Sequence, residues 1–194
     1  KIMKDLVYGV GFNDRKYPSW VKGKVAKEYH LWNSLLLRCY NPKHHRRQPT
    51  YIGCTTSENF KNYSYFHDWC QNQIGFNQEG YQLDKDLILK GNKLYSEDTC
   101  LFIPSELNTL LINRKVDRGN LPLGVSAHQG RFRVRCCKGS PNRHIGLFNT
   151  AEEAFAAYKR VKEAFIRLQA EKWRAFIDPR AYEALISYTV SITD

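Results

Sequence analysis

Residues 131 to 136 constrain the fold of this chain more than any other stretch, because arginines alternate there with apolar or small side chains. The stretch reads Arg131-Phe132-Arg133-Val134-Arg135-Cys136. Successive side chains of a β-strand point to opposite faces, so the pattern predicts a strand with one cationic face and one apolar face. Only the apolar face of such a strand needs a covering element.

A long amphipathic helix is predicted to follow. Thr150 and Glu153 have the spacing of a capping box, in which each side chain satisfies a backbone N–H group at the start of a helix. Apolar residues then recur at steps of three and four: Ala151, Ala154, Phe155, Tyr158, Val161, Phe165 and Leu168. The apolar side of this helix is expected to cover a three-stranded antiparallel sheet and leave the arginines exposed.

The region from Gly124 to Arg174 resembles the Apetala-type DNA-binding domain of plant ethylene-response factors, a module also appended to many bacteriophage endonucleases. The likeness rests on Gly124-Val125, Gly130-Arg131-Phe132-Arg133-Val134, residues 144–154 and Ala157-Tyr158. The family usually has tryptophan where Phe132 stands. The resemblance implies that the sheet binds the DNA major groove. The candidate DNA-binding residues here are Arg131, Arg133, Arg135, Arg143 and His128.

Positive charge gathers in the same part of the chain. The 194 residues contain 30 Lys and Arg against 19 Asp and Glu, a formal net charge of +11. Residues 108–175 hold 14 of these basic residues and only 5 of the acidic ones. A basic excess concentrated on one module is typical of a phosphate-binding surface, so we expect double-stranded DNA as the partner.

A second stretch with chemical potential runs from Tyr81 to Asn108. Asp84-Lys85-Asp86 follows a predicted strand, Gly91-Asn92 marks a tight loop, and a short predicted helix from Ser105 carries Asn108. This order is the outline of a ββα-metal nuclease site. In such a site, one divalent ion held by a carboxylate and a second oxygen ligand neutralises the scissile phosphate and the leaving oxygen.

Residues Trp32 to Asn108 resemble the phage HNH homing-endonuclease group, whose members commonly carry an Apetala-type module in the same order. The likeness includes residues 38–42 and Gly91-Asn92. It implies that Asp84 and Asn108 hold a divalent metal ion, Mg²⁺ or Mn²⁺. It also places Lys85 where the general-base histidine usually stands, and Thr99 where an asparagine usually orients that base.

The identity of the general base stays open. A lysine is protonated near neutral pH, so Lys85 is a poor base, although it could hold a phosphate. One alternative is that Asp86 or a histidine (His44, His45 or His67) acts as the base. A second alternative is that water bound to the metal attacks the phosphate without a general base. A third is that the site no longer cleaves DNA and the protein only binds it.

A basic run follows Pro42 and reads Lys43-His44-His45-Arg46-Arg47. Because Pro42 is expected to end the preceding helix, this run is predicted to be a loop. Its side chains are either simply solvated, or they contribute to catalysis and to binding a DNA strand. In the second case Arg46 and Arg47 are candidate DNA contacts.

The six cysteines contain no C-x-x-C pair, so the spacing does not indicate a zinc ribbon. We expect buried thiols in the core. The alternative is a metal cluster formed by Cys39, Cys54, Cys70 and Cys100.

Together these patterns predict an α+β protein in three parts. Residues 1–112 form an HNH-like, ββα-metal nuclease module with flanking helices and an N-terminal arm, residues 113–121 a basic linker, and residues 122–194 an Apetala-type domain with a C-terminal helix. The predicted function is a sequence-directed DNA endonuclease, and the alternative is a non-catalytic DNA-binding protein derived from one. We expect a monomer or weak dimer, without membrane association, in the cytoplasm of a bacterial or phage-infected cell.

Overall fold

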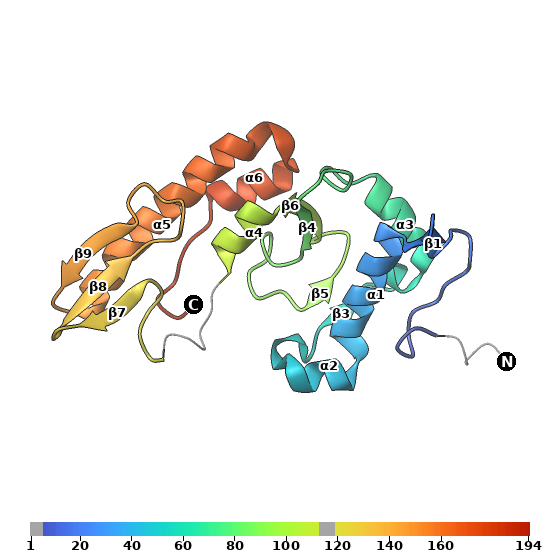
Figure 1. Ribbon diagram of the computed structural model, residues 1–194, viewed down its shortest axis with the longest axis horizontal. Coiled ribbons are helices and arrows are strands. Elements are labelled where there is room, and N and C mark those ends of the chain that lie inside the picture. The colour runs from blue at the N-terminus through green and yellow to red at the C-terminus, as the bar shows by residue number, and fades with distance from the viewer. Residues whose placement is uncertain (1–5, 113–118) are drawn as a thin grey trace. The chain divides into compact units, whose positions relative to one another are not determined.

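The computed structural model describes residues 6–112 and 119–194 (Figure 1). It is an α+β protein whose contacts divide it into two compact units, Lys1–Pro104 and Ser105–Asp194. Residues 113–118, most of the predicted linker, lie outside the described part.

The first unit combines helices with three short strand pairs. Its helices are α1 (Lys27–Tyr40), α2 (Pro42–Arg47) and α3 (Tyr63–Gln71), with 3-10 turns at Pro49–Tyr51 and Asn59–Lys61. Strand β1 (Trp20–Val21) pairs with β2 (Lys24–Val25), β3 (Thr55–Thr56) with β5 (Leu94–Tyr95), and β4 (Tyr81–Asp84) with β6 (Leu101–Pro104). The β3–β5 pair is parallel and the other two are antiparallel.

An aromatic core holds the first unit together. Trp32 on α1 is fully buried and donates a hydrogen bond from its indole nitrogen to the Phe60 carbonyl oxygen, at 2.8 Å. Its ring lies 5.3 Å from that of Tyr63, and Phe102 from β6 is buried in the same core. Because this core anchors β6, which pairs with β4, it also fixes the two ends of the loop between them.

The second unit contains the predicted sheet and helix. It consists of α4 (Ser105–Leu111), β7 (Val125–His128), β8 (Arg131–Arg135), β9 (His144–Phe148), α5 (Ala151–Trp173), a 3-10 turn at Arg174–Phe176, and α6 (Pro179–Ile186). The strands form an antiparallel sheet in the order β7-β8-β9, and Figure 1 shows them along one side of α5. The predicted three-stranded antiparallel sheet packed on a long helix is confirmed.

Local sequence explains where α5 begins and what it covers. The Thr150 side chain accepts a hydrogen bond from the Glu153 backbone N–H at 3.1 Å, as the capping box predicts. Val125 and Val134 from the sheet are buried against Phe155 and Tyr158 from the helix. At its other end, α5 packs against α6, whose N-terminus is capped by Asp178.

Side chains of α5 attach α4 to the second unit. The buried Lys162 ammonium donates to the carbonyl oxygen of Leu110, at 2.6 Å, in the last turn of α4. Lys172 forms an ion pair with Glu106, with a shortest distance of 3.0 Å. Contacts therefore group residues 105–111 with the C-terminal unit.

The prediction of a loop at Lys43–Arg47 is wrong, because these residues lie on α2. Asn41 caps this helix by accepting hydrogen bonds from the N–H groups of Lys43 and His44, at 2.8 and 3.1 Å. Pro42 occupies the first helical position, where its missing N–H costs nothing. The proline that was expected only to end one helix also starts the next.

Candidate functional site

Cross-strand pairing defines one cationic face of the C-terminal sheet. Arg131, Arg133 and Arg135 alternate on β8 with Phe132 and Val134, which contribute to the core against α5. Residues directly opposite each other on neighbouring strands share a face. The arginine face therefore comprises Arg131, Arg133 and Arg135 with their partners Ser126, His128, His144 and Leu147.

The three arginines of this face are not neutralised within the protein. Arg131 and Arg135 are exposed and Arg133 is half-buried. In the described part of the chain, none of them takes part in an ion pair. Arg131 donates to the Leu147 carbonyl oxygen at 3.2 Å, and the buried Nε of Arg133 has no hydrogen-bond partner among the described residues. Their charge is thus available to an anionic partner.

The other predicted DNA contacts occupy three places. His128 is half-buried on the arginine face, opposite Arg131. Arg143 is exposed just before β9, where its carbonyl oxygen accepts a hydrogen bond from the Cys136 N–H at 2.9 Å. This hydrogen bond sets the Arg143 backbone beside Cys136, and the Arg143 side chain is not among those that define the arginine face. Arg46 and Arg47 are exposed on α2, in the first unit.

The predicted catalytic histidines also lie on α2. His45 Nε2 is 2.7 Å from the Arg38 carbonyl oxygen, which commits that nitrogen to a helix-to-helix contact. The His44 ring lies 5.5 Å from the Tyr51 ring, and its buried Nε2 has no partner among the described residues.

Asp84 ends β4 and organises the loop that follows. Its Oδ1 accepts hydrogen bonds from the N–H groups of Asp86 and Leu87, at 3.0 and 2.7 Å. Burial raises the pKa of the Asp84 carboxyl above its ordinary value of 3.8, against the lowering effect of the N–H group of Leu87. The second carboxylate oxygen accepts no hydrogen bond from the described residues.

Lys85, expected to hold a phosphate if it has a chemical role, is directed into the protein. It is only 9% exposed, and its ammonium donates to Asp86 Oδ1 at 2.7 Å and to the Asn92 carbonyl oxygen at 2.6 Å. The same ammonium lies 5.6 Å from the centre of the Tyr95 ring. Lys85 therefore ties the two sides of the loop together.

Asn92 connects several parts of the loop through hydrogen bonds, a role that the sequence did not predict. Its buried amide nitrogen lies within hydrogen-bond distance of the carbonyl oxygens of Lys85 and Leu94, at 2.9 and 2.7 Å, and of Thr99 Oγ1 at 3.0 Å. Its amide oxygen accepts from the Leu94 N–H at 3.0 Å. Thr99 is thus a partner of Asn92, and the Gly91-Asn92 turn was the only sequence signal for this role.

The two predicted metal ligands fall in different units. Asp84 belongs to the first, and Asn108 is half-buried on α4 in the second. The donor chemistry of Asp84 fits Mg²⁺ or Mn²⁺, because hard divalent ions prefer oxygen ligands and the second carboxylate oxygen has no protein donor. Among residues 6–112 and 119–194, no group of three or more His, Cys, Asp and Glu side chains is placed to hold a metal ion.

The four cysteines of the first unit, Cys39, Cys54, Cys70 and Cys100, are buried and free. Burial raises the pKa of Cys39 and Cys100 to about 12 and shifts that of Cys70 upward as well. Thiols whose pKa is raised in this way are protonated and unreactive near neutral pH.

Within the described residues, no helix is long and apolar enough to cross a membrane. Comparison with protein-family models, curated proteins and solved structures finds no match for this chain.

Proposed function

We propose that this protein is a sequence-directed DNA endonuclease that binds duplex DNA through the arginine face and cuts or nicks it with its N-terminal unit. The observation that carries the proposal is the arginine face itself. Three arginines share one side of a narrow sheet, α5 covers the opposite side, and no described acidic side chain pairs with them.

A surface of this kind suits the DNA major groove. The groove admits a small β-sheet, and an arginine can donate two hydrogen bonds to the edge of a guanine. Exposed arginines also contact phosphates, which supply affinity without sequence information. The arginine face offers both types of contact, since Arg133 is central and half-buried while Arg131 and Arg135 are exposed beside it.

The cutting role rests on the elements around Asp84. In the chain, β4 with its terminal carboxylate is followed by its antiparallel partner β6 and then by α4, the order of a ββα-metal site. When bound, a divalent ion supplies charge neutralisation at the scissile phosphate. Asp84 would hold it through the oxygen that the loop leaves unbonded.

The proposal admits two sources of the nucleophile: water activated by Asp86 or by a histidine (His44, His45 or His67), or metal-bound water that needs no base. Asp86 is exposed and lies beside the candidate metal carboxylate, although Lys85 pairs with one of its oxygens. His44 has a ring nitrogen without a described partner, whereas the Nε2 of His45 contacts the Arg38 carbonyl oxygen. Because that nitrogen of His44 is buried, Asp86 is the more accessible of these candidate bases.

One observation favours a second function, DNA binding without cleavage. Lys85 stands where the resemblance implies a general-base histidine, and its ammonium is held by Asp86 and Asn92 inside the loop. A charged lysine in these contacts cannot accept a proton.

Incubation with supercoiled plasmid, with and without Mg²⁺ or Mn²⁺, separates the two functions. Metal-dependent nicking that is lost in Asp84→Ala supports the endonuclease. Binding of the plasmid without nicking supports the second function, DNA binding without cleavage. If the protein neither retains nor nicks the plasmid, both functions are wrong.

A further inference from the structure

Two adjacent cysteines stand apart from the buried thiols of the first unit. The sulfur atoms of Cys136 and Cys137 lie 3.4 Å apart. Cys136 directly follows β8 and is buried in the core between the sheet and α5, whereas Cys137 is half-buried. The pair is therefore a vicinal dithiol with one sulfur nearer to solvent.

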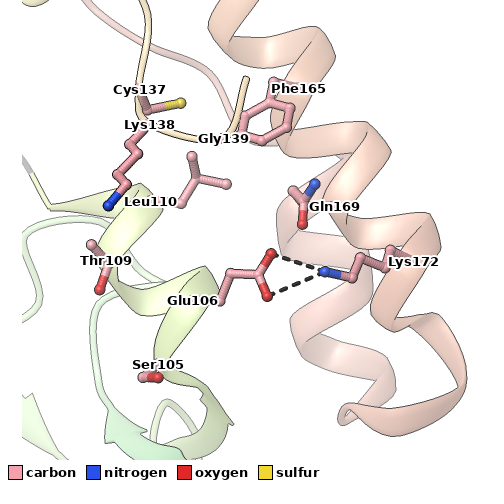
Figure 2. A pocket seen from close by; sticks show the side chains of 10 residues that line it. All are labelled: Ser105, Glu106, Thr109, Leu110, Cys137, Lys138, Gly139, Phe165, Gln169 and Lys172. Atoms are coloured by element: carbon pink, nitrogen blue, oxygen red, sulfur yellow. Dashed lines mark hydrogen bonds and ion pairs between the residues drawn. The ribbon is translucent and has the colours of Figure 1, made fainter. Parts of the chain in front are cut away.

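A cavity reaches the Cys137 side of this pair. It has a volume of about 580 Å³ and is lined by Cys137 together with Leu110, Lys138, Phe165 and Gln169, among others. Figure 2 shows Cys137 and Lys138 at one end of it. Small-molecule sites have volumes of roughly 300–1,000 Å³, so a reagent that carries a phenyl ring has room to reach the sulfur of Cys137.

The surroundings of the pair favour a thiolate. The hydrogen bond from Cys137 lowers the pKa of Cys136 to about 6, and Ser140 and the positive charge of Lys162 act in the same direction. The same hydrogen bond raises the pKa of Cys137. The first proton thus leaves the pair more easily than it leaves an isolated cysteine, whose pKa is about 8.5.

The sulfur separation selects a coordination geometry. With thiolate bonds of about 2.3 Å, an atom bonded to both sulfurs would have an S–X–S angle of about 95°. That angle is narrower than the tetrahedral angle of about 109° in structural zinc sites. It suits a pyramidal trivalent centre with a lone pair, of which arsenic(III) is the thiophilic example.

We propose that Cys136 and Cys137 form a bidentate site for monosubstituted trivalent arsenicals. An aryl arsenoxide has two valences to exchange, one for each sulfur. Two S–H bonds and the arsenic–oxygen bond break, two arsenic–sulfur bonds form, and the oxygen leaves with both protons as water. No electrons are transferred, so no oxidant or reductant is required. This site is independent of the proposed DNA function.

Phenylarsine oxide is the probe. The intact, freshly reduced protein is freed of reductant, treated under native conditions and measured by mass spectrometry. We expect one arsenical per chain with loss of one water, and peptide mapping that places it on residues 136 and 137. The adduct is expected to survive excess glutathione and to be removed by 2,3-dimercaptopropanol, because a chelating dithiol competes with the protein pair far better than two separate monothiols do.

Single variants test the bidentate geometry. Cys136→Ala and Cys137→Ala are each expected to bind the arsenical roughly 10²-fold more weakly, because the second bond is no longer intramolecular. Cys54→Ala, which removes a buried thiol of the first unit, is the matched control and should bind like the wild type. No adduct on the wild type, or an adduct mapped to another cysteine, would overturn the proposal even if a variant failed to fold.

Discussion

Arg133 on β8 lies directly opposite Leu147 on β9, at the centre of the arginine face. The guanidinium makes no ion pair with the described residues, and Leu147 is 42% exposed although it is apolar. A hydrogen-bond donor beside an exposed apolar side chain matches neighbouring features of the major groove, where guanine presents acceptors and thymine a methyl group.

Replacement of Arg133 by alanine tests the first half of this match. A binding site is first selected from random duplexes, and its affinity is then measured by fluorescence anisotropy. Arg133→Ala is expected to weaken specific binding by about 1–3 kcal/mol and to relax the preference at one base pair. Arg167→Ala removes the same charge from an exposed position on α5 and should leave specific affinity unchanged. Equal losses of specific affinity in both variants would show that Arg133 does not contact a base.

Replacement of Leu147 tests the second half. Leu147→Ser removes the apolar contact without a change in charge. We expect a weaker preference for thymine at one position of the selected site. The slope of log affinity against log salt concentration should stay the same, because that slope counts phosphate contacts. An unchanged base preference would show that Leu147 does not face a base.

Local patterns made the second unit predictable from sequence. The period-two alternation of β8 and the Thr150 cap at the start of α5 act over a few residues, and the structure shows both. Around α2, the prediction of a loop is wrong, because Pro42 ends α1 and, together with the Asn41 cap, also starts a new helix.

Contacts between distant residues could not be predicted. Lys162 meets Leu110 across 52 positions of sequence, so the attachment of α4 to α5 leaves no periodic signal. Lys85 and Asn92 are closer in sequence, but their pairing depends on the path of the whole loop. The sequence showed an unusual lysine at position 85, and only the structure showed where its ammonium points.

Asp84→Asn is expected to change the stability of the protein and its DNA cleavage in different ways. Burial raises the pKa of Asp84, so the ionised carboxylate is disfavoured in the folded state. The contribution of the Asp84 carboxyl to the free energy of unfolding is therefore largest below its ordinary pKa of 3.8. This contribution is lost as the pH rises through the pKa of the folded state. Asparagine keeps the Oδ1 acceptor for the N–H groups of Asp86 and Leu87 and carries no charge.

At pH 7 we therefore expect Asp84→Asn to have a melting temperature equal to or above that of the wild type, with the difference shrinking as the pH falls toward 3.8. Metal-dependent nicking should fall by on the order of 10²-fold or more, because a ligand of the ion has lost its charge. Calorimetry across pH and a plasmid assay provide the two measurements. Undiminished nicking would contradict Asp84 as a metal ligand.

Lys85→Met is expected to destabilise the first unit. It leaves the Asn92 carbonyl oxygen without its ammonium partner in a buried site, which costs about 1–3 kcal/mol. Lys93→Met is the matched control, since Lys93 is exposed in the same loop and its hydrogen bond to the Thr50 carbonyl oxygen is also exposed. Urea unfolding at one pH measures both. A lower salt slope of DNA binding in Lys85→Met alone would instead indicate that Lys85 contacts a phosphate.

Gly124→Ala is expected to disrupt the packing of the sheet on α5. Gly124 has φ +72°, and a Cβ built there would lie 2.1 Å from Cδ2 of the Tyr158 ring, which is buried in the core. Backbone strain and overpacking together should cost about 2–4 kcal/mol.

Gly130 has a similar φ of +75° in the β7–β8 turn, but its Cβ would meet no described atom within 4 Å. Gly130→Ala should therefore cost only the strain, about 1 kcal/mol. Chemical denaturation of the two variants separates the effects, and equal losses would show that Tyr158 moves aside without cost.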